Sequence, residues 1–281
     1  MKDYRNGEIP QKGFTHGAKF HSDDVFATAF LRILNPDIQI ERGFEVPENY
    51  DGIVYDIGRG AFDHHQQDKE YRENGCPYAA FGLIWRTYGA AFVGEEEAQR
   101  FDEHFIQPLD ESDNTGCSNT LAKIIDEFNP GWDSDEPYDD CFWKAVDLAE
   151  IVLRNHFRSV EGLKRASAIV KKAMEEGDGK VLVLSTFVPW KREVIGSSYQ
   201  FVVYPSNRGG YSIQGVTVSD EDNTLVCAFP KEWYGAEADR LQEMSGITSL
   251  RFCHPNGFLA ATETLEDAVK AAEYAMAASD K

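Results

Sequence analysis

The chain has 281 residues, of which 42% are hydrophobic, enough apolar material for one large or two medium cores. Its 48 acidic residues against 28 basic ones give a formal charge of −20, which argues against a protein that wraps a long polyanion non-specifically. No apolar run approaches the length of a membrane-spanning helix, the first residues are too polar for a signal peptide, and five widely spaced cysteines without a Cys-x-x-Cys pair exclude a disulfide scaffold. We therefore expect a protein of the reducing cytoplasm without a membrane partner.

The first third of the chain predicts short strands that alternate with helices. Its strand-like segments are residues 12–20, 38–44, 52–58 and the strand end 62–65. Ser22–Asp24 offers N-capping side chains and first-turn acids to a helix that ends at Asn35–Pro36, and a second helix is expected over about residues 78–88. This alternation favours an α/β fold in which helices cover a parallel sheet.

Residues 94–140 form an acidic segment. They contain 15 acidic residues, opposed only by Arg100 and Lys123, so they supply most of the net charge and are expected to form a solvated surface. From about residue 137 to residue 176, apolar side chains recur every three or four positions, as in a helix. Forty residues is long for one globular helix, so we expect two helices or a bent one.

The last third of the chain has a different, β-rich texture. Two strand-like runs surround a turn at Ser206–Gly210 and predict a hairpin, Phe252–Phe258 predicts a strand–turn–strand, and Thr264–Ser279 predicts a closing helix. We expect a catalytic domain over residues 1–136, a helical connector over residues 137–178 and a smaller α+β domain over residues 179–281.

Histidines and aspartates gather near the predicted strand ends. Four of the seven histidines lie within residues 16–65, close to aspartates in the runs His16–Asp24, Tyr55–Asp56 and Asp63–His65. A lone histidine is usually a surface or core residue, and an aspartate at a strand end is usually a turn former. Together, however, imidazole and carboxylate ligands at one edge of a parallel sheet suit manganese, iron or zinc. The spacing therefore predicts a metal site.

Several motifs resemble those of the melanocyte-proliferating-gene (Myg) protein family, long called metal-dependent protein hydrolases. The matching segments are residues 15–27, 55–58, 62–66, 109–114, 129–132, 189–191, 245–247 and 252–258. The likeness covers nearly the whole chain in the right order, although Thr115 separates Asn114 from the glycine that often follows it directly in the family. The family is itself similar in its motifs to the DHH phosphoesterase superfamily, so the resemblance implies a DHH-like N-terminal domain.

The resemblance implies a site with two divalent cations, most often Mn, with Mg, Fe or Zn as alternatives. One cation would be held by His16, His21 and Asp56, and the other by Asp23, Asp56, His64 and Asp113, with Asp56 bridging. Asp56, His64 and His65 would be catalytic: His65 would face the substrate phosphate. Asp63 would orient a neighbouring side chain.

Further substrate contacts are expected in the second domain. The Phe252–Phe258 segment is either an ordinary Pro-Asn-Gly turn or a loop in which His254, Asn256 and Gly257 touch a phosphate or sugar, and Lys191 is another candidate. The basic residues of the predicted helix, Arg154 to Lys172, either complement the helix dipole or guide an anionic substrate.

The resemblance implies a metal-dependent phosphodiesterase, a 3′-to-5′ exonuclease on RNA or short oligonucleotides, with water activated by two metals. The net charge favours short substrates over long duplexes. The alternatives are a phosphatase or pyrophosphatase acting on nucleotides, and a metal-stabilised regulatory protein without turnover. The sequence leaves metal identity, digestion polarity and oligomeric state open.

Overall fold

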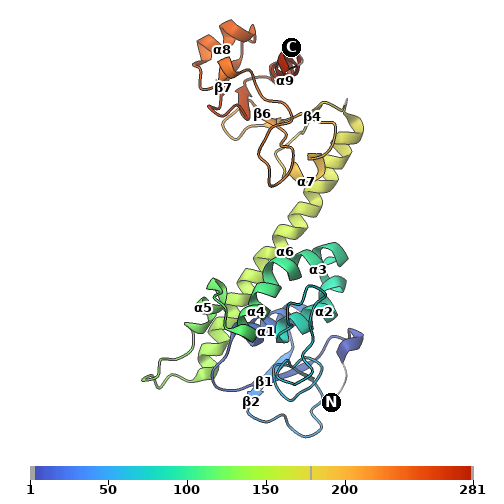
Figure 1. Cartoon of the computed structure of the whole chain (residues 1–281), viewed down its shortest axis with the longest axis vertical. Coiled ribbons are helices and arrows are strands. Elements are labelled where there is room, and N and C mark those ends of the chain that lie inside the picture. Colours follow the sequence, from blue (N-terminus) through green and yellow to red (C-terminus); the bar gives the residue numbers. More distant parts are fainter. Residues whose placement is uncertain (1–3, 178, 280–281) are drawn as a thin grey trace. The chain divides into compact units, whose positions relative to one another are not determined.

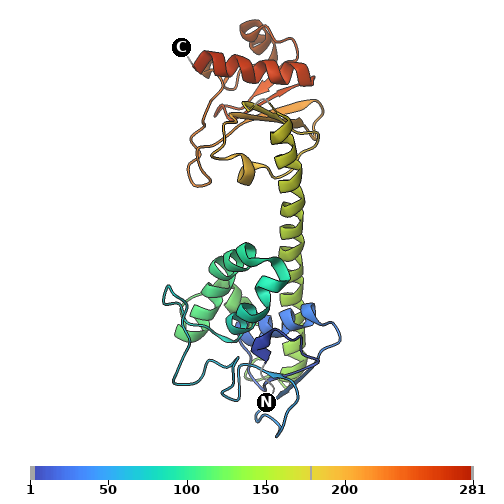
Figure 2. The ribbon, with the colours of Figure 1, turned by 90° about the vertical axis from the view of Figure 1, so that its right-hand side faces the viewer.

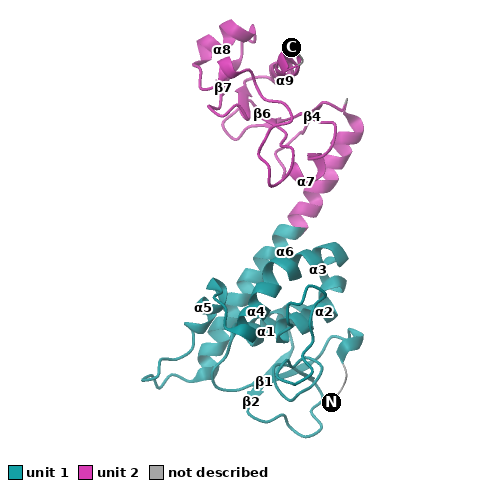
Figure 3. Ribbon diagram, in the orientation of Figure 1, with its two compact units in different colours: residues 1–160 teal, residues 161–281 magenta. Residues whose placement is uncertain are grey.

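A computed structural model describes residues 4–177 and 179–279, and its strands and helices form the expected α/β fold. The chain divides into two units, residues 1–160 and residues 161–281, and each is described below on its own (Figure 3). Among the described residues, no helix is both long and apolar enough to span a bilayer.

The first unit is built on a parallel sheet of three strands, β1 (Lys12–His16), β2 (Gln39–Gly43) and β3 (Ile53–Val54), in the order β2-β1-β3. The strands expected within residues 12–20 and 38–44 are confirmed. The third strand is shorter than expected because the chain turns after Val54, and Asp56 has a left-handed φ of 54°. The strand end expected at residues 62–65 is wrong beyond Phe62, which forms a single bridge to Tyr55 and then enters a loop.

Helices pack on this sheet and on one another (Figure 1). They are η1 (Tyr4–Asn6), α1 (Ser22–Leu34), α2 (Ala80–Val93), α3 (Glu95–Phe101), the π-helical turn η2 (Asp102–Ile106), α4 (Gln107–Thr115) and α5 (Thr120–Asp126). Most acidic residues of the segment 94–140 are exposed, as expected of a solvated surface, but α3, α4, α5 and η2 also bury an apolar side against the core. Phe101, Ile106, Leu109 and Ile125 are buried there among the acids.

Helix α6 (Tyr138–Glu176) is one uninterrupted helix, so the expectation of two helices is wrong. No proline interrupts it, and its only internal glycine is Gly162. Its first half buries Val146 and Leu153 in the core of the first unit, whereas Val170 belongs to a core cluster of the second unit. The boundary between the units at residues 160–161 falls inside this helix.

The second unit contains a mixed sheet of five strands in the order β4-β5-β6-β8-β7. Its elements are β4 (Val181–Val183), α7 (Lys191–Val194), β5 (Phe201–Pro205), β6 (Tyr211–Gly215), η3 (Lys231–Trp233), α8 (Ala238–Ser245), β7 (Leu250–Cys253), β8 (Leu259–Thr262) and α9 (Leu265–Ser279). The predicted hairpin is β5–β6, and the predicted strand–turn–strand is β7–β8. The closing helix α9 contacts all five strands and covers one face of the sheet (Figure 2).

Candidate metal centre

The side chains at the carboxyl edge of the first sheet come from strand ends and from the helix that follows β1. His16 is the last residue of β1, and Asp56 follows β3 by two residues. After β1 the chain enters α1, whose N-cap is His21 rather than one of the expected residues Ser22–Asp24. Parallel strands end at one edge, so these segments converge there.

One group of potential ligands consists of His16, Asp24 and Asp56. His16 Nε2 lies 3.1 Å from Asp56 Oδ2 and 3.3 Å from Asp24 Oδ2, while its Nδ1 is 3.1 Å from the Gly17 carbonyl oxygen. A proton on Nδ1 would be donated to that carbonyl, which leaves Nε2 free to act as a ligand. Sequence reasoning treated Asp24 as a first-turn acid, and its place beside His16 was missed.

A second group surrounds His64. Its Nε2 lies 3.1 Å from Asp56 Oδ1, 3.3 Å from Asp113 Oδ2 and 3.8 Å from Asp23 Oδ2. Asp56 therefore directs one carboxylate oxygen towards His16 and the other towards His64. Its left-handed backbone is a costly conformation for a residue with a side chain, and such conformations concentrate at functional sites.

His21 is placed differently from the resemblance-based assignment. Its ring centroid is 6.1 Å from that of His16, and its potential ligand atom groups with those of Asp23 and Asp113. The His21 backbone N–H donates to Asp24 Oδ1 at 2.9 Å, which fixes the start of α1. The structure thus brings Asp24, and not His21, into the group with His16 and Asp56.

His65 is the most accessible of these imidazoles, with a side chain that is 61% exposed. Its Nδ1 is 2.9 Å from Asp63 Oδ1, and Asp63 also accepts the backbone N–H groups of Arg59 and His65. Asp63 therefore orients its neighbour, as expected. The Nδ1 contact leaves Nε2 of His65 available to a ligand.

The positive charges near the buried carboxylates of the centre are too few to neutralise them. Burial raises the pKa of Asp24 well above its usual range, and burial together with the charge of Asp23 raises the pKa of Asp113 to about 9. Burial alone would raise the pKa of Asp56 as well, but the imidazoles of His16 and His64 lower it to about 2. Burial lowers the pKa of both histidines, yet Asp56 and the neighbouring carboxylates raise it to about 9.

This donor set fits a divalent cation. Asp23, Asp24 and Asp56 are almost completely buried, and Asp23 Oδ1 and Asp24 Oδ2 have no hydrogen-bond partner among the residues that the structure describes. Buried carboxylates are normally hydrogen-bonded, paired or bound to a metal. Positive charge placed among them would relieve both the repulsion and the lost hydrogen bonds.

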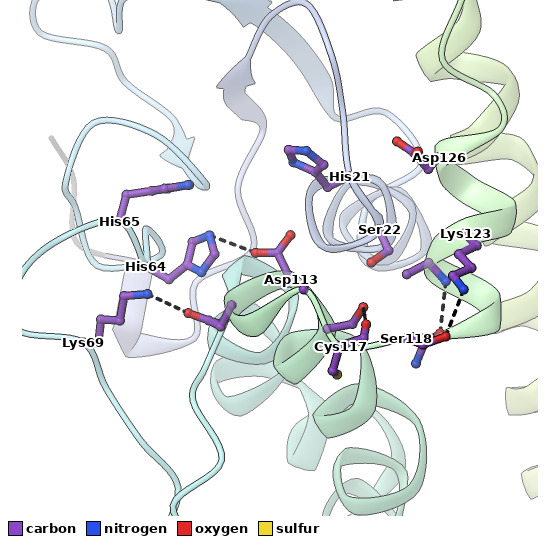
Figure 4. A pocket seen from close by; sticks show the side chains of 15 residues that line it. His21, Ser22, His64, His65, Lys69, Asp113, Cys117, Ser118, Lys123 and Asp126 are labelled. Atoms are coloured by element: carbon purple, nitrogen blue, oxygen red, sulfur yellow. Dashed lines mark hydrogen bonds and ion pairs between the residues drawn. The ribbon is translucent and has the colours of Figure 1, made fainter.

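A cavity of about 570 Å³ opens beside the centre, lined by His64, His65 and Asp113 (Figure 4). Lys69 and Lys123 reach it from opposite sides of Asp113. Lys69 Nζ donates to Asn114 Oδ1 and Lys123 Nζ to Ser118 Oγ, both at 2.9 Å. Within residues 4–177 and 179–279, neither lysine forms an ion pair, so both charges are available to an anion.

A buried ion-pair network fixes helix α4, which carries Asp113. Arg72 Nη2 lies 2.8 Å from Asp110 Oδ2, and Arg72 also binds Asp102. Asp110 Oδ1 accepts the Gly82 N–H at 3.3 Å, and a Cβ on Gly82 would lie 1.9 Å from Asp110 Oδ2. Helix α4, and with it Asp113, is thus held against α2 at Gly82, a position where only glycine fits.

The candidate substrate residues of the second unit do not form one group. Lys191 begins α7, whereas His254, Asn256 and Gly257 lie in the turn between β7 and β8. His254 Nδ1 accepts the Asn256 N–H at 3.1 Å, and His254 lines a cavity that Lys191 does not. Their role in substrate binding stays a prediction.

The basic residues of α6 are partly neutralised along the helix. Arg154 pairs with Glu150 at 2.7 Å and Lys171 with Glu193 at 3.3 Å. A track for an anionic substrate along this helix stays a prediction as well.

Comparison with known proteins identifies related chains of similar length. Residues 13–276 match the family model MYG1_exonuc, described as an uncharacterised protein family (UPF0160). The MYG1 protein of Schizosaccharomyces pombe is 25% identical over 93% of this chain and 96% of its own length. The proteins named MYG1 exonuclease in Rattus norvegicus and Homo sapiens are 26% and 27% identical, each over 95% of this chain and over 85% and 86% of their own lengths. No solved structure matches the chain.

Proposed function

The chain belongs to the MYG1 family, and from this premise we propose that it is a divalent-metal-dependent phosphodiesterase that removes nucleotides from an end of RNA or short oligonucleotides. Relatives named exonuclease support a nuclease-like hydrolase. The observation that carries the proposal is the Asp56 carboxylate, which faces His16 with one oxygen and His64 with the other among buried acids. Such a carboxylate can join two cation sites.

We propose two cations, with manganese as the first choice because carboxylate and imidazole ligands suit it. His16, Asp24 and Asp56 would hold one, and Asp23, Asp56, His64 and Asp113 would hold the other. His21, whose potential ligand atom groups with those of Asp23 and Asp113, would join this second cation. Bound there, a two-metal centre supplies a nucleophile near neutral pH and neutralises phosphoryl oxygens.

The chain's own residues would bind and orient the substrate. Asp63 accepts the Nδ1 proton of His65 and raises the pKa of its imidazole, so the protonated ring can donate through Nε2 to a phosphoryl oxygen at the open side of the centre. Lys69 and Lys123 line the same cavity and bring two positive charges that form no ion pair with any described residue. They would hold the phosphates on either side of the one that reacts.

The substrate we favour is short. Tight binding of a long strand needs many Lys or Arg contacts with phosphates, and the excess of 48 acidic over 28 basic residues opposes such binding. The direction 3′ to 5′ follows from the family resemblance. The five free cysteines support a reducing compartment such as the cytoplasm.

The proposal is tested with metal-depleted protein to which Mn is restored, assayed on single-stranded RNA oligonucleotides, nucleotides and pyrophosphate. We expect oligonucleotide hydrolysis that requires the metal and is lost in Asp56→Asn. The matched control, Asp37→Asn, changes an exposed acid far from the cluster and should keep full activity. Faster release of phosphate from nucleotides would favour a phosphatase instead, and activity unaffected by chelation would contradict the metal centre.

A further inference from the structure

The face of the second unit's sheet that points away from α9 is covered in part, by Trp190 and Val194, and a cavity opens over the rest of it. Helix α9 packs on the opposite face, where Val203, Ile213 and Ala260 are buried. Side chains alternate along each strand, so the neighbours of these residues point away from α9. The strand register aligns three of these neighbours, Tyr204, Ser212 and Ala261, in one row across the sheet, and Phe252 of β7 pairs with Ala261 at the end of that row.

This row forms a trough with small side chains in the middle and aromatic side chains at the two ends. Phe187 packs against Tyr204 with ring centroids 5.0 Å apart. At the other end, the ring centroids of His254 and Phe252 are 6.3 Å apart. A cavity of about 700 Å³ lies between these walls. Phe187 and Phe252 are 54% and 40% exposed, although apolar side chains of this size are usually buried.

The charge around the trough differs from that of the rest of the chain. Although the sequence has 48 acidic residues, the part of the chain that the structure describes contributes no carboxylate to the lining. Its charged residues are Arg208 and Arg251. Arg251 is held by Glu263 and by the Gly209 carbonyl oxygen, whereas the described residues offer Arg208 no ion-pair partner. Arg208 is therefore available to an anion.

We propose that this trough binds a nucleobase of a single-stranded oligonucleotide. A planar ring can stack on Phe252 or on the Phe187–Tyr204 pair over the small floor, and an adjacent phosphate can pair with Arg208. A duplex offers no free base face, so the trough selects unpaired strands. The choice of a nucleic acid as ligand rests on the proposed function.

The test is the binding of a fluorescently labelled oligoadenylate to the full chain in EDTA, where the metal centre contributes no cation. Loss of one stacking contact in Phe252→Ala should weaken binding roughly 5- to 150-fold, and Phe252→Tyr should restore it. Arg208→Ala should weaken binding and lower the slope of log K against log salt by about 0.7, the value for one phosphate of a single strand. Val218→Ala and Arg240→Ala, an exposed apolar and an exposed basic residue of the same unit outside the trough, are the matched controls.

A duplex that binds as tightly as the single strand, or Phe252→Ala with wild-type affinity, overturns the inference. A small chromogenic phosphodiester without a base reports on the metal centre alone. If Phe252→Ala binds oligoadenylate normally while the wild type hydrolyses this diester, the trough assignment fails and the proposed function stands. If the diester is not hydrolysed but binding depends on Phe252, the proposed function fails and the base site stands.

Discussion

Replacement of Asp113 by Asn tests whether the buried acids form a cation site. Asp113 Oδ2 lies 3.3 Å from His64 Nε2, and only 12% of the side chain is exposed. Burial and the charge of Asp23 raise the pKa of this carboxyl to about 9. Without a cation, the native state therefore keeps the Asp113 carboxyl protonated at pH 7, where an aspartate in water is ionised.

The sign of the effect follows from this pKa. The unfolded chain has an Asp pKa near 3.9, so the folded protein loses stability as the pH rises from about 4 towards about 9. At pH 7 this loss is at most about 4 kcal/mol, since each of three pKa units is worth about 1.4 kcal/mol. Asp113→Asn removes it, so the metal-free variant should be more stable than metal-free wild type at pH 7 and equal to it near pH 4.

The assay is thermal unfolding in EDTA and in Mn between pH 4 and pH 8. For a unit of 160 residues, a gain of 4 kcal/mol corresponds to a rise of roughly 8–16 °C in the unfolding temperature. In wild type, Mn at a hundred times its dissociation constant should add about 2.7 kcal/mol per site, and Asp113→Asn should lose much of this gain. Asp126→Asn, a half-exposed acid of the same cavity, is the control. Lower stability of Asp113→Asn in EDTA at pH 7, or an undiminished response to Mn, would refute the reasoning.

Three further predictions concern the adjacent histidines, the length of the substrate and the glycine that packs against Asp110. Elemental analysis should show that His64→Ala loses metal together with activity, whereas His65→Ala keeps both cations. His65→Ala should lower the rate or the substrate affinity by about one to two decades, because one charged hydrogen bond is lost. Activity should reach a plateau after a few nucleotides, and long duplexes should bind weakly with a shallow salt slope in a filter-binding assay. Gly82→Ala should destabilise the protein by about 3 kcal/mol in urea unfolding because its methyl group displaces the Arg72–Asp110 pair. Gly162→Ala, where the added Cβ would make an ordinary 3.9 Å contact with Arg165 Nη2, should instead add about 0.5–1 kcal/mol to the stability.

Much of the fold could be predicted from local sequence patterns. The apolar strands before His16 and Asp56, the first turn of α1 and the β5–β6 hairpin are each specified by residues next to one another in the sequence. The site depends on them because the ends of β1 and β3 must meet at one sheet edge. For this reason, alternating strands and helices were enough to predict that His16 and Asp56 come together.

The features that could not be predicted from the sequence depend on packing between residues that are far apart in the chain. The pairing of Arg72 with Asp110 joins residues 38 positions apart, and neither stands in a pattern that points to the other. The acidic segment, residues 94–140, has few apolar residues, so its charge pattern alone does not predict which of its side chains are buried. Helix α6 has the extent that its pattern predicted but is one helix, because each half packs in a different core, which stabilises both halves without a break.

The adjacent aspartates of α1 show why a motif alone does not assign ligands. Successive residues of a helix point about 100° apart, so Asp23 and Asp24 must face different directions. Asp23 approaches His64, and Asp24 approaches His16. Which acid serves which side depends on the helix rotation, and the contacts of Asp24 with the His21 N–H and of Asp23 with the Ala80 N–H fix that rotation. Since Ala80 begins α2, the division of the two acids between the two halves of the centre is set by helix packing and lies outside any local motif.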